Sequence, residues 1–461
     1  MLQARRHALP VWGIALLLSG CAAVRSYDAE LHMTLERASS GNIDSAIELL
    51  EANNRRRDKD LLYYLELGML QRLGGRYEQS QKSWMAASAR IQDERASGLA
   101  EMQNRVRGVS SYIVSDKLRA YRGHDYEKVM LLTYMALNHL AMGDYDSARI
   151  AIKQTHEFEA EIAELRSRQF AEVEEQARKR GAHTSFKDLN GYPVETIDNA
   201  EVNALKNSYQ SALSHYLAGF VYEALDEPSL AAPGYRLANE LQPAQPVLEE
   251  GLRGLDERLS APDEGMTDVL IIIGTGSAPA LQSLPFRLPL WVQNKLILVA
   301  ASFPVMTVTS AASLPTQVAL DGQTLAAARI TSVDLMARRR LKDDMPGIML
   351  RAAIRSTASA VLQYQAQRAG DKDHAAGMAL AAAAVMAGSS VLDSADDRTW
   401  RALPSEISVA RGRVRQGVHT VTLDTPEGPR SARVRLSGRH AVIDLRLLRH
   451  QLFVNAPREA R

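Results

Sequence analysis

Cysteine is almost absent from this chain of 461 residues, because Cys21 is the only one. A single cysteine excludes a disulfide framework and any zinc site built from several cysteines. An excess of positive charge is also missing, since 55 Lys and Arg face 54 Asp and Glu, and this balance excludes a globally basic nucleic-acid binder. Hydrophobic residues make up 46% and charged residues 24%. These fractions are typical of a packed protein and not of a disordered or multi-span membrane chain.

Recognisable catalytic motifs are missing too. The eleven histidines show no His-Glu-x-x-His spacing, and there is no Gly-x-Ser-x-Gly string. Gly-Thr-Gly at 274–276 follows an apolar run but lacks the third glycine and the Lys-Ser/Thr of a phosphate loop, so we interpret it as a turn after a strand. We therefore predict no enzyme activity, no metal and no cofactor. A carboxylate pair among the many acidic residues is the open alternative.

The first 20 residues have the pattern of a secretory signal peptide. Arg5 and Arg6 precede an apolar run at 8–18, which is too short to cross a membrane core that needs about twenty residues. The string LSGC at 18–21 resembles a bacterial lipobox, in which the signal peptide is cleaved before the cysteine and the cysteine becomes the diacylated N-terminus. Ala22 follows where an aspartate usually means retention in the inner membrane. We expect a lipid-anchored protein on the periplasmic face of the outer membrane, with Cys21 as the lipidated (palmitate-bearing) residue.

Residues 21–258 form the first predicted domain, and residues 28–258 have helical periodicity throughout. GNIDSAIELL (41–50), GGRYEQSQKSW (74–84) and GDYDSARIAI (143–152) share a turn glycine followed by a small residue. Those small residues are Ala46, Ser80 and Ala148, separated by 34 and 68 residues, which are one and two tetratricopeptide periods. A fourth copy runs from Gly219 to Pro243. We predict a tetratricopeptide-like solenoid, and a plain helical bundle is the alternative.

Several long segments resemble a known group of proteins. They are residues 111–149, 214–243, 271–279, 346–364 and 396–414. These strings are similar to uncharacterised tetratricopeptide-containing lipoproteins of Gram-negative bacteria. The resemblance implies no catalytic residues. It does imply work in the cell envelope, because members appear alongside small lipoproteins similar to activators of peptidoglycan synthases.

The second predicted domain covers residues 266–457 and has an α+β composition. VLIIIG (269–274) and LILVAASFPVMTV (296–308) are apolar runs of strand character. A helical insertion is expected at about 333–392, followed by strand-like segments after Pro404. The Ala-rich stretch 374–392 suits a buried helix, with membrane contact as the alternative. The predicted fold class is thus α+β, with an N-terminal α-solenoid and a β-rich domain that carries a helical insertion.

Two candidate binding surfaces follow from these patterns. In the tetratricopeptide pattern, two positions of the first helix of each repeat line the concave groove. On this sequence they are Leu65, Met69, Thr133, Leu137, Tyr216 and Phe220. An apolar strip open to water marks an interaction site. We therefore expect this strip to be covered, either by an apolar segment of a partner or by the chain's own insertion helices.

The second surface is basic. Residues 404–461 hold eleven arginines against five acidic residues. The period of two predicts that these arginines share one face of a sheet, suited to an anionic partner or balanced by the acidic solenoid. They are Arg411, Arg413, Arg415, Arg433 and Arg435.

Together, the sequence predicts an outer-membrane lipoprotein that acts as a scaffold or adaptor in protein–protein interaction, with cell-envelope or peptidoglycan assembly as the expected setting. An accessory subunit of an envelope transport or secretion machine is one alternative. A carboxylate-dependent cell-wall enzyme is another. No nucleic-acid partner is expected.

Overall fold

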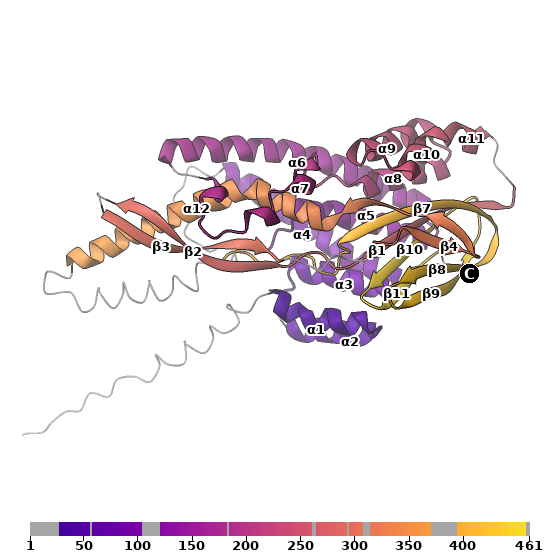
Figure 1. Cartoon of the computed structure of the whole chain (residues 1–461), viewed down its shortest axis with the longest axis horizontal. Helices are drawn as coiled ribbons and strands as arrows, with labels where there is room; N and C mark the ends of the chain where they lie inside the picture. Colours follow the sequence, from indigo (N-terminus) through magenta and orange to yellow (C-terminus); the bar gives the residue numbers. More distant parts are fainter. Residues whose placement is uncertain are drawn as a thin grey trace, which may run out of the picture.

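A computed structural model describes residues 27–55, 58–103, 120–181, 184–260, 264–292, 295–307, 314–369 and 394–457. The predicted signal peptide, Cys21 and the Ala-rich stretch 374–392 lie outside these residues. The described residues begin with helices and end with strands, so the expected mixed fold, with an N-terminal helical region and a strand-rich C-terminal region, is confirmed (Figure 1).

Most of the helical region consists of helix pairs joined by short turns. The pairs are α1 (Tyr27–Ser39) with α2 (Ile43–Asn53), α3 (Leu61–Leu73) with α4 (Tyr77–Gln103), α5 (Asp125–Ala141) with α6 (Tyr145–Arg180), and α8 (Ala212–Ala224) with α9 (Pro228–Leu241). The short helices η5 (Phe186–Asp188), η6 (Val194–Thr196) and α7 (Ala200–Ala204) connect the last two pairs, and α10 (Pro246–Arg253) and α11 (Leu255–Ser260) complete the region.

The repeated glycines lie in the turns inside these pairs. Gly41, Gly75 and Gly143 have φ angles of 83°, 68° and 78°, a conformation that glycine adopts without strain, and Asp226 occupies the fourth turn with a φ of 57°. The small residues that follow these turns are fully buried: Ala46, Ser80, Ala148 and Ala231. Each pair therefore closes on a small side chain at the same place after its turn.

The strands form a two-layer sandwich and one separate hairpin. One sheet has the order β11-β10-β1-β7-β6, with β1 (Met266–Thr275), β6 (Ala328–Ser332), β7 (Glu406–Arg415), β10 (His440–Leu448) and β11 (Gln451–Asn455). The other has the order β5-β4-β8-β9, with β4 (Gln317–Leu320), β5 (Gln323–Ala326), β8 (Gly417–Thr425) and β9 (Gly428–Leu436). The hairpin consists of β2 (Leu281–Val292) and β3 (Lys295–Met306). The long helix α12 (Val333–Ala369) follows β6 in the chain.

Strand β1 lies at the centre and is buried on both faces. Val269, Ile271 and Ile273 pack between the two sheets, whereas Leu270 and Ile272 belong to the core that the helices share. This double burial explains the unbroken apolar run at 269–273, because a strand covered on both sides shows no polar alternation.

The helical and strand regions share one hydrophobic core. A single cluster of buried side chains contains Leu65 of α3, Tyr216 of α8, Leu270 of β1 and Trp400. In Figure 1 the sandwich lies among the helices, while α6, α12 and the β2–β3 hairpin extend to the left of it. Within the described parts of the chain, no helix is long and apolar enough to cross a membrane.

Candidate functional site

The six residues predicted to line a concave groove are all buried by the chain itself. Leu65, Met69 and Leu137 are 1% exposed, Thr133 is 2% exposed, and Tyr216 and Phe220 are fully buried. The hydroxyl groups of Thr133 and Ser214 are hydrogen-bonded at 2.8 Å, which joins α5 to α8. The prediction of a partner-binding groove is therefore wrong for these residues. They are internal core, because strands and a linking segment fill the concave side of the helices.

The linking segment, residues 394–405, supplies much of this cover. The indole of Trp400 is fully buried and lies 6.1 Å from the ring of Trp84 and 6.5 Å from that of Tyr134, measured between ring centroids. The cover therefore comes from a segment between α12 and β7, as well as from the sheet. The chain's own insertion helices are one of the covers predicted for the apolar strip. That prediction left out the linking segment and the sheet.

Two buried carboxylates hold the backbone of the linking segment. Glu127 of α5 accepts a hydrogen bond from the Trp400 N–H at 2.7 Å, and Glu66 of α3 accepts bonds from the N–H groups of Arg401 at 2.7 Å and Ala402 at 3.1 Å. Burial raises the pKa of Glu66 to about 8 and also raises the pKa of Glu127. Helices α3 and α5 thus bind a stretch of this chain that has no helix or strand, through hydrogen bonds from its backbone N–H groups to the two carboxyl groups.

A further ion pair joins the helices to the central sheet. Arg72 of α3 lies 2.7 Å from the carboxylate of Asp444 on β10, and it also donates to the side-chain oxygen of Asn138 at 2.7 Å. Arg72 is 1% exposed and Asp444 4%. Breaking a buried ion pair leaves an uncompensated charge, which is costly. The Arg72–Asp444 pair therefore fixes the position of the sheet against α3.

Arg411 is a core residue and not part of a binding surface. Its guanidinium lies 2.8 Å from Glu223 of α8 and 2.6 Å from Asp268 of β1, and Arg258 is 2.6 Å from Glu223. Burial alone would raise the pKa of Glu223. Hydrogen bonds from His440 and Arg258 and the charge of Arg411 outweigh burial and hold that pKa well below its usual range.

The same cluster contains side chains that could bind a metal ion, but its negative charges are already balanced by arginines. The ligand atoms of Glu223, Asp268 and His440 lie within 4.8 Å of one another. The guanidinium groups of Arg258 and Arg411 already compensate the two carboxylates, so a divalent cation would add unbalanced charge to a buried place. We interpret this cluster as an interlock between α8 and the sheet.

The five predicted surface arginines do not share one face. Arg411 pairs with Leu270 across β7 and β1, so the set Arg411, Arg413 and Arg415 lies on the face of that sheet turned toward the helices. On β9, Val434 and Leu436 point into the sandwich, which places Arg433 and Arg435 on its outer face. Arg413, Arg415, Arg433 and Arg435 are exposed. The prediction of one basic face is wrong, because the two strands belong to different layers.

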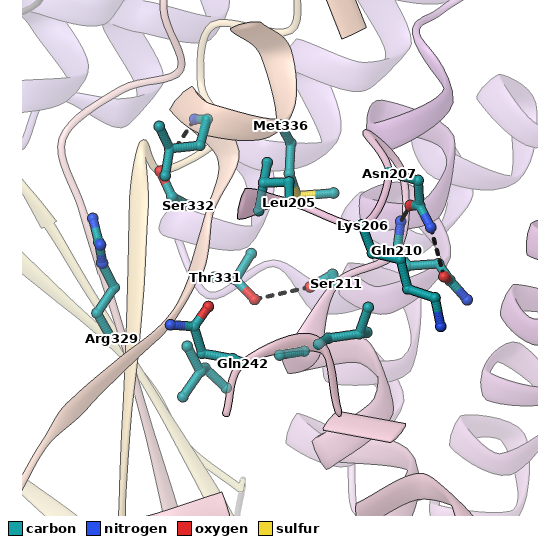
Figure 2. A pocket seen from close by; sticks show the side chains of 14 residues that line it. Leu205, Lys206, Asn207, Gln210, Ser211, Gln242, Arg329, Thr331, Ser332 and Met336 are labelled. Atoms are coloured by element: carbon teal, nitrogen blue, oxygen red, sulfur yellow. Dashed lines mark hydrogen bonds between the residues drawn. The ribbon is translucent and has the colours of Figure 1, made fainter. Parts of the chain in front are cut away.

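A cleft opens where the helices meet the edge of the central sheet. It is lined by residues 205–212, by Gln242 at the end of α9, and by β6 with the start of α12, and it encloses about 470 Å³ of space, part of it open solvent. Figure 2 shows the Ser211 and Thr331 hydroxyls, which are hydrogen-bonded at 3.1 Å, between its two sides. Asn207 donates to Gln210 at 2.7 Å on the helical side. No lining residue is acidic, histidine or cysteine, and polar and apolar side chains both line the cleft, so it suits recognition of a partner rather than acid–base chemistry.

A histidine pair lies between α6 and α8. The rings of His156 and His215 stack with centroids 4.9 Å apart and an angle of 15°, and Nε2 of His215 is 3.0 Å from the carboxylate of Glu159. Burial lowers the pKa of His156, and the neighbouring His215 lowers it further. Parallel rings do not aim their in-plane nitrogens at one point, so this pair is packing between helices and not a metal centre. His215 is 2% exposed and is a packed core residue.

Sequence reasoning missed the two carboxylates that hold the linking segment. A signal was present for one of them, because Glu66 stands in LLYYLELGML, whereas Glu127 stands just before the apolar run VMLL. A lone acid inside an apolar stretch, as at Glu66, indicates a carboxylate that needs buried partners, whereas Glu127 has Asp125 and Lys128 beside it and gives no such signal. The partners of the two carboxylates, three backbone N–H groups more than 270 residues away, could not be read from the sequence.

Comparison with known proteins gives little. No family model matches the chain, and no curated protein matches it. A tetratricopeptide repeat protein from Parabacteroides merdae ATCC 43184 is similar over 50% of this chain and 98% of its own length, with 16% sequence identity and a TM-score of 0.14. At that score the likeness carries no argument about fold or function.

Proposed function

We propose that this chain is an outer-membrane lipoprotein that acts as a scaffold on the periplasmic side. The observation that carries the proposal is the string LSGC at 18–21, which places the only cysteine of the chain directly after a signal-like segment. The first described helix starts at Tyr27, six residues after Cys21, so a lipid on that cysteine would hold the folded body close to the membrane.

The helix pairs support the scaffold part of the proposal. We infer that they are tetratricopeptide-like repeats, because their turns and buried small residues recur at positions 34 and 68 residues apart, at the period of that repeat. Repeats of this kind present surfaces to other proteins. Since the linking segment fills the concave side, a partner would bind elsewhere. The polar cleft and the outer face of β9 with Arg433 and Arg435 are the surfaces we propose for it.

The lipid anchor is tested with Cys21→Ser. We expect the wild-type chain to fractionate with the outer membrane through a high-salt wash, and the variant to appear as uncleaved precursor or as unanchored protein. A variant that stays with the outer membrane through the same wash would show that lipid is not the anchor, and the proposal would fail at its first step.

The scaffold role is tested by purifying the lipidated chain from detergent-solubilised envelopes. We expect a defined envelope protein to co-purify in fixed ratio, and we expect its yield to fall when residues of the cleft, such as Gln242 or Lys206, are replaced by Glu. The same preparation is assayed on purified peptidoglycan. Release of soluble fragments by the chain without a partner would assign an enzyme and overturn the scaffold.

A further inference from the structure

Strand β9 is the last strand of the β5-β4-β8-β9 sheet, and one of its two edges has no strand beside it among the described residues. On the other edge all nine of its residues pair with β8, from Gly428 opposite Thr425 to Leu436 opposite Gly417. The exposed residues of β9 are Pro429, Arg430, Ser431, Arg433 and Arg435. An edge strand of this kind presents backbone N–H and C=O groups with which another strand can pair.

The hydrogen bonds of β8 show which groups of β9 point outward. Thr420, opposite Arg433, directs its backbone toward β4: its N–H donates to the Asp321 carboxylate at 2.7 Å, and its C=O accepts from the Asp321 N–H at 2.9 Å. In an antiparallel pair, two opposite residues either exchange both backbone bonds or direct them to their other sides. The N–H and C=O of Arg433 therefore point away from β8, and those of Ser431 do the same because the pattern repeats every two residues. Pro429 lies in the same series, where a proline breaks no bond to β8.

The other three sheet edges are covered or short. On β6, the Leu213 N–H at the start of α8 donates to the Thr331 hydroxyl at 3.0 Å. On β11, Phe453 packs in a buried cluster with residues of α1, α2 and α3. Strand β5 has only four residues. The outer edge of β9, which we define as the side turned away from β8, is therefore the long and exposed edge of the described sheets.

The side chains along this edge select what can pair with it. Strand β9 carries three arginines and no acidic residue. A second copy of β9 would bring arginines close to arginines, and like charges opposite each other destabilise a strand pair. Arg433 and Arg435 lie on the outer face of the sandwich, whereas Val434 and Leu436 point inward. An added strand with Asp or Glu beside the arginines, alternating with apolar residues beside the inward positions, would suit both faces.

We propose that the outer edge of β9 binds an extended acidic segment of a partner protein, which adds to this sheet as a fifth, antiparallel strand. The backbone groups of Ser431 and Arg433 supply hydrogen bonds that do not depend on the partner's sequence, and the guanidinium groups select carboxylates. The direction is antiparallel because every described pair in this sheet is antiparallel. The inference rests on the proposed scaffold function and gives the chemistry of the partner at the β9 surface.

Peptide binding to the chain without residues 1–20 and with Cys21→Ser tests the proposal. The probes are short labelled peptides in which glutamate alternates with valine, measured by fluorescence anisotropy. In an antiparallel added strand the residue opposite Arg433 exchanges backbone bonds with it and lies on the same face, so the glutamate N–H groups point at β9. Methyl groups on the valine nitrogens should leave binding intact. Methyl groups on the glutamate nitrogens should weaken it about tenfold or more, at equal charge.

The two peptides differ only in which backbone donors remain. If the glutamate-methylated peptide binds as tightly as the valine-methylated one, or more tightly, charge without strand pairing holds it and the inference is overturned. Absence of binding by the valine-methylated peptide overturns it as well. Neither result depends on a change to the protein.

Substitutions in β9 test the same edge from the other side. Ser431→Pro removes one outward N–H and no bond to β8, so it should weaken binding of the valine-methylated peptide about fivefold. Ser431→Ala loses only the hydroxyl, which is 2.8 Å from that of Thr422, and should bind like the wild type. Arg433→Glu should weaken binding about fivefold, more at low salt, whereas Arg415→Glu makes the same charge change on the other sheet and should not. A folded Ser431→Pro chain with wild-type affinity would overturn the proposal.

Failure of this inference differs from failure of the proposed function. If an envelope protein co-purifies equally with the wild type and with Ser431→Pro, the scaffold role stands and the β9 edge is not its binding site. If no envelope protein co-purifies with the wild type, the scaffold role fails, whatever the peptides show.

Discussion

At the scale of single residues, buried polar and charged side chains determine how the two halves of this chain meet. Glu66 and Glu127 accept backbone N–H groups of the linking segment, Arg72 pairs with Asp444, and Arg411 lies between Glu223 and Asp268. Each group is costly to bury alone and acceptable with its partner. These contacts join residues that are 143 to 372 positions apart in the chain and therefore specify one arrangement of the sheet against the helices.

Glu66 should make stability depend on pH. Its pKa is about 8 in the folded chain against 4.5 for an ordinary glutamate. Its contribution to the free energy of unfolding is therefore complete below pH 4.5 and is lost as the pH rises through 8. Between pH 6 and pH 9 the wild type should lose about 2–3 kcal/mol relative to Glu66→Gln. Urea unfolding of both chains across this range measures the difference. A constant difference would mean that Glu66 is ionised throughout.

At the scale of elements, two of the helix pairs are closed by contacts between a glycine and an aromatic ring. A Cβ added to Gly68 would lie 2.2 Å from the Trp84 ring, and one added to Gly219 would lie 2.6 Å from the Tyr235 ring. In both pairs the glycine precedes the aromatic residue by 16 positions, across the turn. The same local solution therefore recurs in α3–α4 and α8–α9, as expected for copies of one unit.

Gly219→Ala should consequently destabilise the chain by about 1–3 kcal/mol. The Tyr235 ring has no room to move, because its hydroxyl donates to Glu223 at 2.5 Å and accepts from Arg411 at 3.0 Å. Gly347→Ala in α12 is the matched control. A Cβ there meets only side-chain atoms at 3.4 Å or more, so the helix preference of alanine should raise stability slightly. Denaturant midpoints compare the two, and equal effects would contradict the close contact.

The linking segment is the element that the sequence pattern did not distinguish from its surroundings. Trp400→Ala should destabilise the chain by about 3–5 kcal/mol, because the indole is fully buried between Trp84 and Tyr134. Trp400→Phe keeps a ring in place and should lose much less. Thermal or urea unfolding measures both. If Trp400→Ala unfolds like the wild type, the concave side is filled by something other than this segment.

At the scale of the whole molecule, the helices and the sandwich present different surfaces. The concave side is closed, the cleft is polar, and the exposed arginines lie on two opposite faces of the sandwich. The hairpin extends to the same side as α6 and α12 (Figure 1). A molecule with separate polar and basic surfaces suits the proposed scaffold better than a single groove would.

The basic outer face of β9 can be tested against the other arginine pair. Arg433→Glu with Arg435→Glu should weaken retention of the unlipidated chain on isolated envelopes, more at low salt than at high salt, since surface charge is screened. Arg413→Glu with Arg415→Glu makes the same charge change on the opposite layer and should have the smaller effect. If neither pair of substitutions changes retention at any salt concentration, none of the four arginines contributes to binding the envelope.

Much of the secondary structure could be predicted from local pattern. The helical period over 28–258, the turn glycines and the apolar run of β1 are signals carried by neighbouring residues, and the structure places helices, turns and a buried strand there. The site could be predicted only in part. The spacing identified Tyr216 and Phe220 as part of an apolar strip. Whether a partner protein or the chain itself covers that strip depends on residues 394–405, which are far away in sequence.

What the sequence determined by itself is therefore local: the order of helices and strands, the closing of helix pairs on small residues, and the lipobox-like string around Cys21. What only the tertiary structure decided is which of these faces remain free. Arg411 and Arg433 look alike along the chain, yet one is held between two carboxylates and the other is exposed. Periodicity specifies on which side of an element a residue lies. The layer that packs against that side comes from distant parts of the chain, and only their packing determines whether it meets protein or water.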